Sequence, residues 1–185
     1  MKIGVPVLAA VLACASSTTF AADVTIKMRA VSSSGIGKEI GTIRAVDTRK
    51  GLRLVPRLTG LTAGPHGFHL HENPSCAPKG KDGKMGAALA AGGHFDPDHA
   101  GGHMGPAGKG HIGDLPALVA DAKGEVRKPV LAPRLKVDDL WGRALVIHAG
   151  GDNYSDQPAA LGGGGTRVAC ARIVKAKTGA KAKKR

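Results

Sequence analysis

Short stretches in which apolar and polar residues alternate recur along this chain of 185 residues. Val24, Ile26 and Met28 alternate with polar neighbours, and Leu52 and Leu54 do the same. Residues two apart lie on the same face of a strand, so each stretch predicts a strand with one buried face. Further strands are expected at residues 40–46, 68–71, 125–131, 140–147 and 166–174. The pattern predicts an all-β domain, an antiparallel sandwich or barrel.

Residues 1–21 have the order of features found in a secretory signal: Lys2, an apolar run, and a small-residue exit ending at Ala21. We expect cleavage after Ala21, the alternative being a short buried helix. Cys14 stands in a segment that faintly resembles a lipoprotein cleavage box, so lipidation there is a minor alternative. No apolar run approaches the roughly 18 residues that span a bilayer, which argues against a transmembrane helix in the mature protein.

Residues 175–185 form a basic tail with six of the chain's 27 lysines and arginines, separated by alanine, threonine and glycine. We expect this tail to be disordered and to make at most weak electrostatic contact with anionic surfaces. The alternative is a solvated end that adds solubility. No aromatic residue is interleaved to stack on bases, so specific nucleic-acid recognition is not expected. The predicted domain therefore covers residues 22–174.

Two cysteines, Cys76 and Cys170, remain after removal of the signal segment. An even pair in an exported protein predicts one disulfide rather than two free thiols. Such a bond closes a loop of about 94 residues, and the chain-entropy model assigns a loop of that size roughly 4–5 kcal/mol of stabilisation.

Two long segments, residues 72–116 and 149–165, are rich in glycine and lack hydrophobic periodicity. All eight histidines lie between His66 and His148, and four of them fall in the first segment. Loops this long in a compact domain are usually functional. We therefore expect bound metal to order the first loop.

The spacing of the histidines suggests two groups of ligands. His69 and His71 are two apart on a predicted strand, so their rings project from the same face and can share one ion. The second group, which suits a closed tetrahedral zinc site, consists of three imidazoles and one carboxylate within 21 residues: His94, His103, His111 and Asp114. His148 ends an apolar strand, where a lone histidine is more often a surface or core residue than a ligand.

These motifs together resemble the copper,zinc superoxide dismutase family in its exported bacterial form. The resemblance covers about residues 23–174, and it rests on an ordered set of motifs: Gly67-Phe68-His69-Leu70-His71-Glu72, His94-Phe95-Asp96-Pro97, His103-Met104-Gly105-Pro106, residues 111–116, residues 146–152 and residues 162–170. It implies a Greek-key antiparallel β-sandwich or flattened barrel with two long loops organised by metal.

The resemblance also implies a role for each ligand. Copper is held by His69, His71, His94 and His148, and zinc by His94, His103, His111 and Asp114. His94 bridges the metals, with one ring nitrogen on each. The implied activity converts superoxide to dioxygen and hydrogen peroxide by alternate reduction and reoxidation of copper, and His94 takes and releases a proton.

Three further positions follow from the same resemblance. Arg167 is expected to attract and orient the superoxide anion. Cys76 and Cys170 match the family disulfide, which tethers a loop near Arg167. Asp152 is the expected carboxylate that accepts hydrogen bonds from ligand histidines of both metals, with Asp156 as the alternative. His66 and His99 match no ligand position and are expected to be loop residues.

Two other functions remain open from the sequence. A copper-binding or copper-delivery module of the same fold would lack a ligand or the arginine, and this chain has all of them. Zinc in both sites would give a hydrolase or a structural protein, but no residue is placed as an evident general base or nucleophile. We further expect a periplasmic protein that forms a homodimer.

Overall fold

The computed structural model describes residues 22–175, so the predicted signal segment and all but the first residue of the basic tail lie outside the described residues. Within that range the chain forms eleven strands and three short 3-10 helices, with no α-helix. No described helix meets the length and hydropathy that a membrane crossing needs. The strands are β1 (Asp23–Ser32), β2 (Gly35–Thr48), β3 (Gly51–Leu58), β4 (Gly64–His66), β5 (Phe68–His71), β6 (Lys79–Lys81), β7 (Lys84–Gly86), β8 (Leu118–Ala120), β9 (Val130–Ala132), β10 (Arg143–His148) and β11 (Arg167–Ile173).

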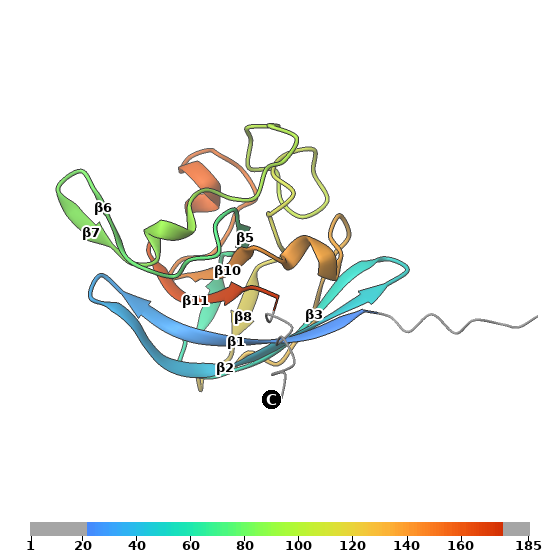
Figure 1. The fold of residues 1–185 in the computed structure, drawn as a ribbon, viewed down its shortest axis with the longest axis horizontal. Coiled ribbons are helices and arrows are strands. Elements are labelled where there is room, and N and C mark those ends of the chain that lie inside the picture. Colours follow the sequence, from blue (N-terminus) through green and yellow to red (C-terminus); the bar gives the residue numbers. More distant parts are fainter. Residues whose placement is uncertain (1–21, 176–185) are drawn as a thin grey trace, which may run out of the picture.

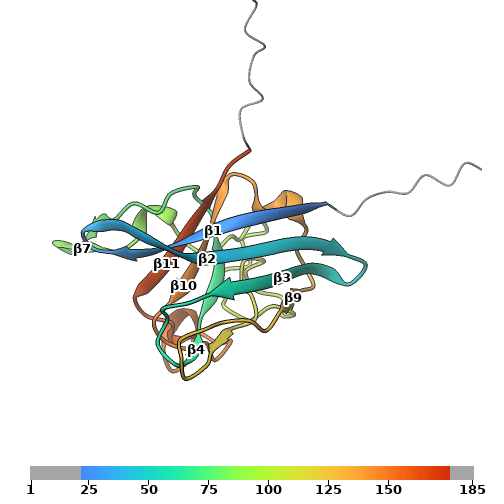
Figure 2. The same cartoon turned by 90° about the horizontal axis from the view of Figure 1, so that it is seen from below.

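Seven strands form one curled antiparallel sheet in the order β5-β10-β11-β1-β2-β3-β9 (Figures 1 and 2). Two small sheets, β4-β8 and β6-β7, complete the structure. The pairing of β11 with β1 joins the two ends of the domain. The all-β sandwich or flattened barrel expected from the sequence is confirmed.

The alternation in the sequence sets which faces are buried. Ile26 and Met28 on β1 point into the core, as do Leu52, Leu54 and Leu58 on β3, while the polar residues between them face solvent. The register pairs Ile26 with Ile43 of β2, so apolar side chains of neighbouring strands meet on the same face. The long loops lie together on the side of the sheet away from β1 and β2 (Figure 1).

The structure differs from the sequence prediction at several elements. Of residues 125–131 only the last two belong to a strand, β9, although Val126 makes an isolated bridge to Leu58. The expected strand at 140–147 begins only at Arg143, because the chain first forms the 3-10 helix η2 (Val137–Leu140). Three-residue strands such as β4, β6, β7 and β8 are too short to show a period of two, and the sequence did not reveal them.

A ring of three backbone hydrogen bonds ties the first long loop to β5. Leu70 N donates to Gly113 O (2.9 Å), Gly113 N donates to Phe95 O (2.8 Å), and Phe95 N donates to Leu70 O (2.8 Å). Leu70 lies between His69 and His71, while Phe95 and Gly113 adjoin His94 and Asp114. This ring therefore brings ligand candidates from three separate segments of the chain together.

The close approach in the ring requires glycine at position 113. A Cβ atom there would lie 2.3 Å from Leu70 O and 2.7 Å from Phe95 N, both of them backbone atoms that cannot rotate away.

We expect Gly113→Ala to lower the free energy of unfolding of the metal-free protein by about 3 kcal/mol, from overpacking and broken buried hydrogen bonds. The variant should also bind less copper and zinc, because the three ligand segments separate. Denaturant unfolding and metal analysis measure the two effects. The control is Gly80→Ala on exposed β6, where the nearest atom to an added Cβ is Met85 Sδ at 3.8 Å. Equal stability of the two variants would contradict the role of the ring.

Candidate metal centre

Four buried histidines converge at the end of the sheet where β5 and β10 lie side by side. His69 and His71 come from β5, His148 is the last residue of β10, and His94 bridges to His71 from the long loop. One ring nitrogen of each histidine lies within 4.8 Å of one ring nitrogen of every other. Because β5 pairs with β10, the sheet itself fixes the separation of three of these rings.

Hydrogen bonds leave one nitrogen of each of these rings without a partner. His69 Nε2 lies 2.7 Å from Asp152 Oδ2, His71 Nδ1 lies 2.9 Å from Gly92 O, and His148 Nδ1 lies 3.0 Å from Gly165 O. Each partner accepts, so these nitrogens donate and the opposite nitrogens carry lone pairs. Those opposite atoms, together with His94 Nε2, are buried and have no hydrogen-bond partner in the part of the chain that the structure describes: His69 Nδ1, His71 Nε2 and His148 Nε2.

A second group forms around the carboxylate of Asp114. The Nδ1 atoms of three histidines surround Asp114 Oδ1, at 2.9 Å for His94, 2.9 Å for His103 and 3.3 Å for His111. His103 Nδ1 and His111 Nδ1 are buried without a hydrogen-bond partner. Three imidazoles and one carboxylate are a donor set that fits tetrahedral zinc. His94 belongs to both groups, with Nε2 facing the first and Nδ1 facing the second.

Asp152 connects the two groups. Its Oδ2 atom accepts from His69 Nε2 and its Oδ1 atom accepts from His103 Nε2, both at 2.7 Å. The carboxylate itself is oriented by the backbone N–H of Tyr154, at 2.8 Å. Asp156, the alternative from the sequence, instead accepts from the backbone N–H of His103 at 2.9 Å. The structure therefore places Asp152, and not Asp156, against histidine rings of both groups.

Burial keeps the histidines of the first group neutral. It lowers the pKa of His69 to about 3 and the pKa of His148 to about 4. The pKa values of His71 and His94 are also lowered, chiefly by burial, with the Arg167 charge adding to the effect on His71. Neutral imidazole is the form that binds a metal, so these rings are ready to do so at neutral pH.

His103 and the two carboxylates beside it have the opposite electrostatic balance. Burial lowers the pKa of His103, but the carboxylates of Asp114 and Asp152 raise it more, to about 9. Burial raises the pKa of Asp114 and Asp152, yet the neighbouring histidines hold both well below the usual range. The two carboxylates thus stay ionised and favour a cation among these rings.

Arg167, the first residue of β11, lies beside the four-histidine group. Its guanidinium donates to Ala88 O and to Gly92 O, both at 2.7 Å, and Gly92 O also accepts from His71 Nδ1. With Lys79 and Lys81 the arginine lines a cleft of about 280 Å³. Arginine and two lysines give this cleft a positive charge suited to small anions.

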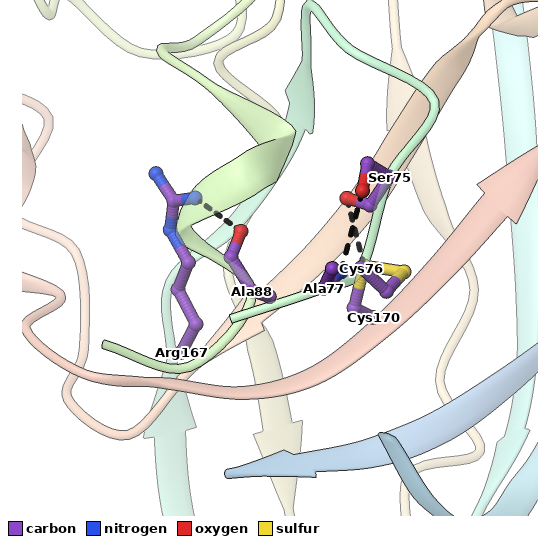
Figure 3. The surroundings of a disulfide bond; sticks show 6 residues. All are labelled: Ser75, Cys76, Ala77, Ala88, Arg167 and Cys170. Carbon is purple, nitrogen blue, oxygen red and sulfur yellow. Dashed lines mark hydrogen bonds between the residues drawn. A yellow bond between two sulfur atoms is a disulfide. The ribbon is translucent and has the colours of Figure 1, made fainter. Parts of the chain in front are cut away.

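The expected disulfide between Cys76 and Cys170 is present, with a Cα–Cα distance of 5.7 Å. Figure 3 shows it joining β11 to the segment around Ser75 and Ala77, with Arg167, at the start of β11, hydrogen-bonded to Ala88. The segment is linked in turn to the 3-10 helix η1 (Leu89–Ala91), because Ala90 N donates to Ala77 O at 3.1 Å. The bond thus holds the carbonyls that orient Arg167 at a fixed distance from β11.

The structure places His66 differently from the sequence prediction. It is 1% exposed at the end of β4, not in a loop, and its Nδ1 and Nε2 atoms lie 2.6 Å from His148 O and 2.8 Å from Thr62 O. It therefore ties the segment before β4 to the backbone of a histidine in the first group. His66 stands two residues before the predicted strand at 68–71, and this is the sequence feature that could have indicated a place in a sheet. His99 is an exposed loop residue, as expected.

Comparison with known proteins gives a consistent result. Residues 39–173 match the model of the copper/zinc superoxide dismutase family. A Salmonella typhimurium protein named superoxide dismutase [Cu-Zn] 2 is 52% identical over 163 residues, which cover 88% of this chain and 93% of that protein. Two solved structures, each 52% identical, have the same fold.

The first of these, Cu/Zn superoxide dismutase from Brucella abortus, has a TM-score of 0.81 and covers 82% of this chain and 99% of its own. The second, the solution structure of the monomeric copper, zinc superoxide dismutase from Salmonella enterica, has a TM-score of 0.75 and covers 83% and 100%. This chain belongs to the copper/zinc superoxide dismutase family.

Proposed function

We propose that this protein converts superoxide to dioxygen and hydrogen peroxide with copper at His69, His71, His94 and His148 and zinc at His94, His103, His111 and Asp114. The observation that carries the assignment is the set of six buried ring nitrogens without hydrogen-bond partners. A buried nitrogen left unpaired is costly. Here all six point into two groups that share His94, and metal ions in those groups would give every one a partner.

Copper held by the first group would supply one-electron redox chemistry, and the second group, which contains Nδ1 of the shared His94, would hold zinc. The remaining work belongs to the chain. His94 Nε2 is the atom that takes a proton and releases it to the product, because His94 Nδ1 is directed at Asp114 Oδ1 in the second group. Asp152 keeps His69 and His103 in one orientation, so the first and second groups keep a fixed position relative to each other.

Arg167 attracts and orients the anion. Its guanidinium is held by two backbone carbonyls, and no carboxylate of the described residues forms an ion pair that would neutralise its charge. Lys79 and Lys81 extend the positive charge along the same cleft. Fixed positive charge in a cleft raises the rate at which a small anion arrives.

The two alternative functions have a poorer fit. A copper-delivery module has no need of an arginine fixed beside the metal group, nor of a second metal group locked to the first. A zinc hydrolase needs an open coordination position on zinc and a general base. The Asp114 group instead offers four protein donors, which would fill a tetrahedral zinc site.

Reconstitution with both metals tests the function. We expect rapid superoxide dismutation by the loaded protein.

His148→Ala should lower copper affinity at least about a hundredfold, beyond the 10–100-fold typical for residues that only support a ligand. It should also abolish turnover while zinc and the fold are retained. The measurements are metal analysis, circular dichroism and a superoxide assay, with His99→Ala in the exposed loop as the control. A fully copper-loaded protein without turnover would favour the copper-binding module instead.

Arg167→Ala should lower the second-order rate about tenfold or more while both metals stay bound, and it should weaken the decline of the rate with ionic strength. Arg172→Ala is the matched control, since it removes the same charge from an exposed position on the same strand. Stopped-flow assays across a salt series measure both effects. Equal rates for the two variants would remove Arg167 from its role.

We also propose that residues 1–21 are a signal removed on export to the periplasm, that 22–174 form the catalytic domain, that 175–185 form an accessory basic tail, and that two chains associate. Among the described residues, exposed apolar side chains such as Met104, Val119, Tyr154 and Leu161 are available for such an association. N-terminal sequencing of the protein from the periplasmic fraction should begin at Ala22, and light scattering should give twice the chain mass. A start at Met1, a blocked start at Cys14, or a single-chain mass would each contradict the corresponding part.

A further inference from the structure

Arg134 projects from a tight turn between β9 and η2. Leu135 N donates to Ala132 O at 3.4 Å, which closes a four-residue turn with Pro133 in its second position. Proline fixes φ at the value that this position requires. Ala132 and Leu135 are 2% and 1% exposed, so both ends of the turn are anchored in the core. The base of the Arg134 side chain is therefore rigid.

The guanidinium of Arg134 binds the backbone of the loop that carries the second metal group. Its Nη1 atom donates to Gly108 O at 2.6 Å and to His111 O at 3.3 Å, and its Nη2 atom donates to Gly110 O at 2.8 Å. No carboxylate of the described residues lies within 4.0 Å of this guanidinium. The hydrogen bonds of this guanidinium therefore go to three backbone carbonyls within residues 108–111.

Among the described residues, the loop backbone satisfies only one of these three carbonyls, that of His111, which accepts from Asp114 N at 3.4 Å. A Cβ at Gly108 would lie 2.2 Å from Met104 O, and a Cβ at Gly110 would lie 2.1 Å from Gly102 O. His111 N donates back to Gly102 O at 2.9 Å. The backbone crosses itself closely, and within residues 22–175 the Gly108 and Gly110 carbonyls have no backbone donor. An arginine with several donors in one plane meets this need, whereas a lysine offers a single charged point.

His111 is the member of the second group that most needs such support. Its side chain is 12% exposed, against 0–1% for His94, His103 and Asp114. Its Nε2 atom has no hydrogen-bond partner from the described chain, whereas His103 Nε2 is held by Asp152. The ring orientation of His111 therefore depends on its backbone.

We propose that Arg134 is a positioning residue for the zinc group: by holding the 108–111 backbone, it keeps His111 Nδ1 aimed at the metal and slows the escape of zinc. This inference rests on the zinc assignment proposed above. Arg134 does not touch the metal, and it acts through the carbonyls on both sides of the ligand.

The test compares zinc release from the copper- and zinc-loaded protein and from Arg134→Gln, with a chromogenic chelator as acceptor. We expect release about tenfold or more faster in Arg134→Gln at equal copper content, the scale seen when a partner that orients a ligand is lost. Arg134→Lys keeps the charge but not the fork, and should recover only part of the retention. Arg53→Gln, at an exposed position of β3, is the control and should release zinc at the wild-type rate.

A second readout separates positioning from general stability. Cobalt placed in the zinc group gives a visible spectrum that reports ligand geometry, and we expect it to change in Arg134→Gln but not in Arg53→Gln. Wild-type release rates and an unchanged cobalt spectrum in Arg134→Gln would overturn the role of Arg134. If the wild-type protein failed to retain zinc at all, the zinc assignment itself would be wrong, and this inference would fall with it.

Discussion

The ring of backbone hydrogen bonds among Leu70, Phe95 and Gly113 is the constraint on which the metal centre depends. Each of the three residues is next to a candidate ligand, so one set of peptide contacts fixes the relative positions of β5, the His94 segment and the Asp114 segment. Backbone contacts hold position more firmly than long side chains because they have no rotamers to average over. Glycine at 113 is what allows the three backbones to approach closely enough.

Around that ring, three of the candidate ligands are oriented by residues from different parts of the chain. His71 is held by the Gly92 carbonyl, His148 by the Gly165 carbonyl, and His69 by the Asp152 carboxylate. The hydrogen bond on one nitrogen decides which atom of the ring offers a lone pair, so these contacts determine chemistry as well as geometry. The loops are long because they must deliver these partners from outside the sheet.

The metal centre of the metal-free chain also lowers the stability of the folded state, and the rest of the fold must offset this loss. Six buried nitrogens have no hydrogen-bond partner within residues 22–175, and two carboxylates are kept ionised beside buried rings. Such groups destabilise a folded chain unless a cation satisfies them. The continuous apolar core and the Cys76–Cys170 cross-link are the features that stabilise the fold against this cost.

The sequence alone predicted the all-β class, because the alternation of apolar residues on β1 and β3 is a local property of the chain. The ordered histidine motifs likewise pointed to the family, and they named the candidate ligands that the structure brings together in two groups. It misplaced His66, missed β4 and β8, and revealed nothing of Arg134, whose partners lie more than twenty residues away in sequence. It also left Asp152 and Asp156 unresolved, since both follow His148 at plausible spacing. Only the tertiary structure decided between them, because which carboxylate reaches the rings depends on how the 149–165 segment folds back over β5, and no local pattern encodes that path.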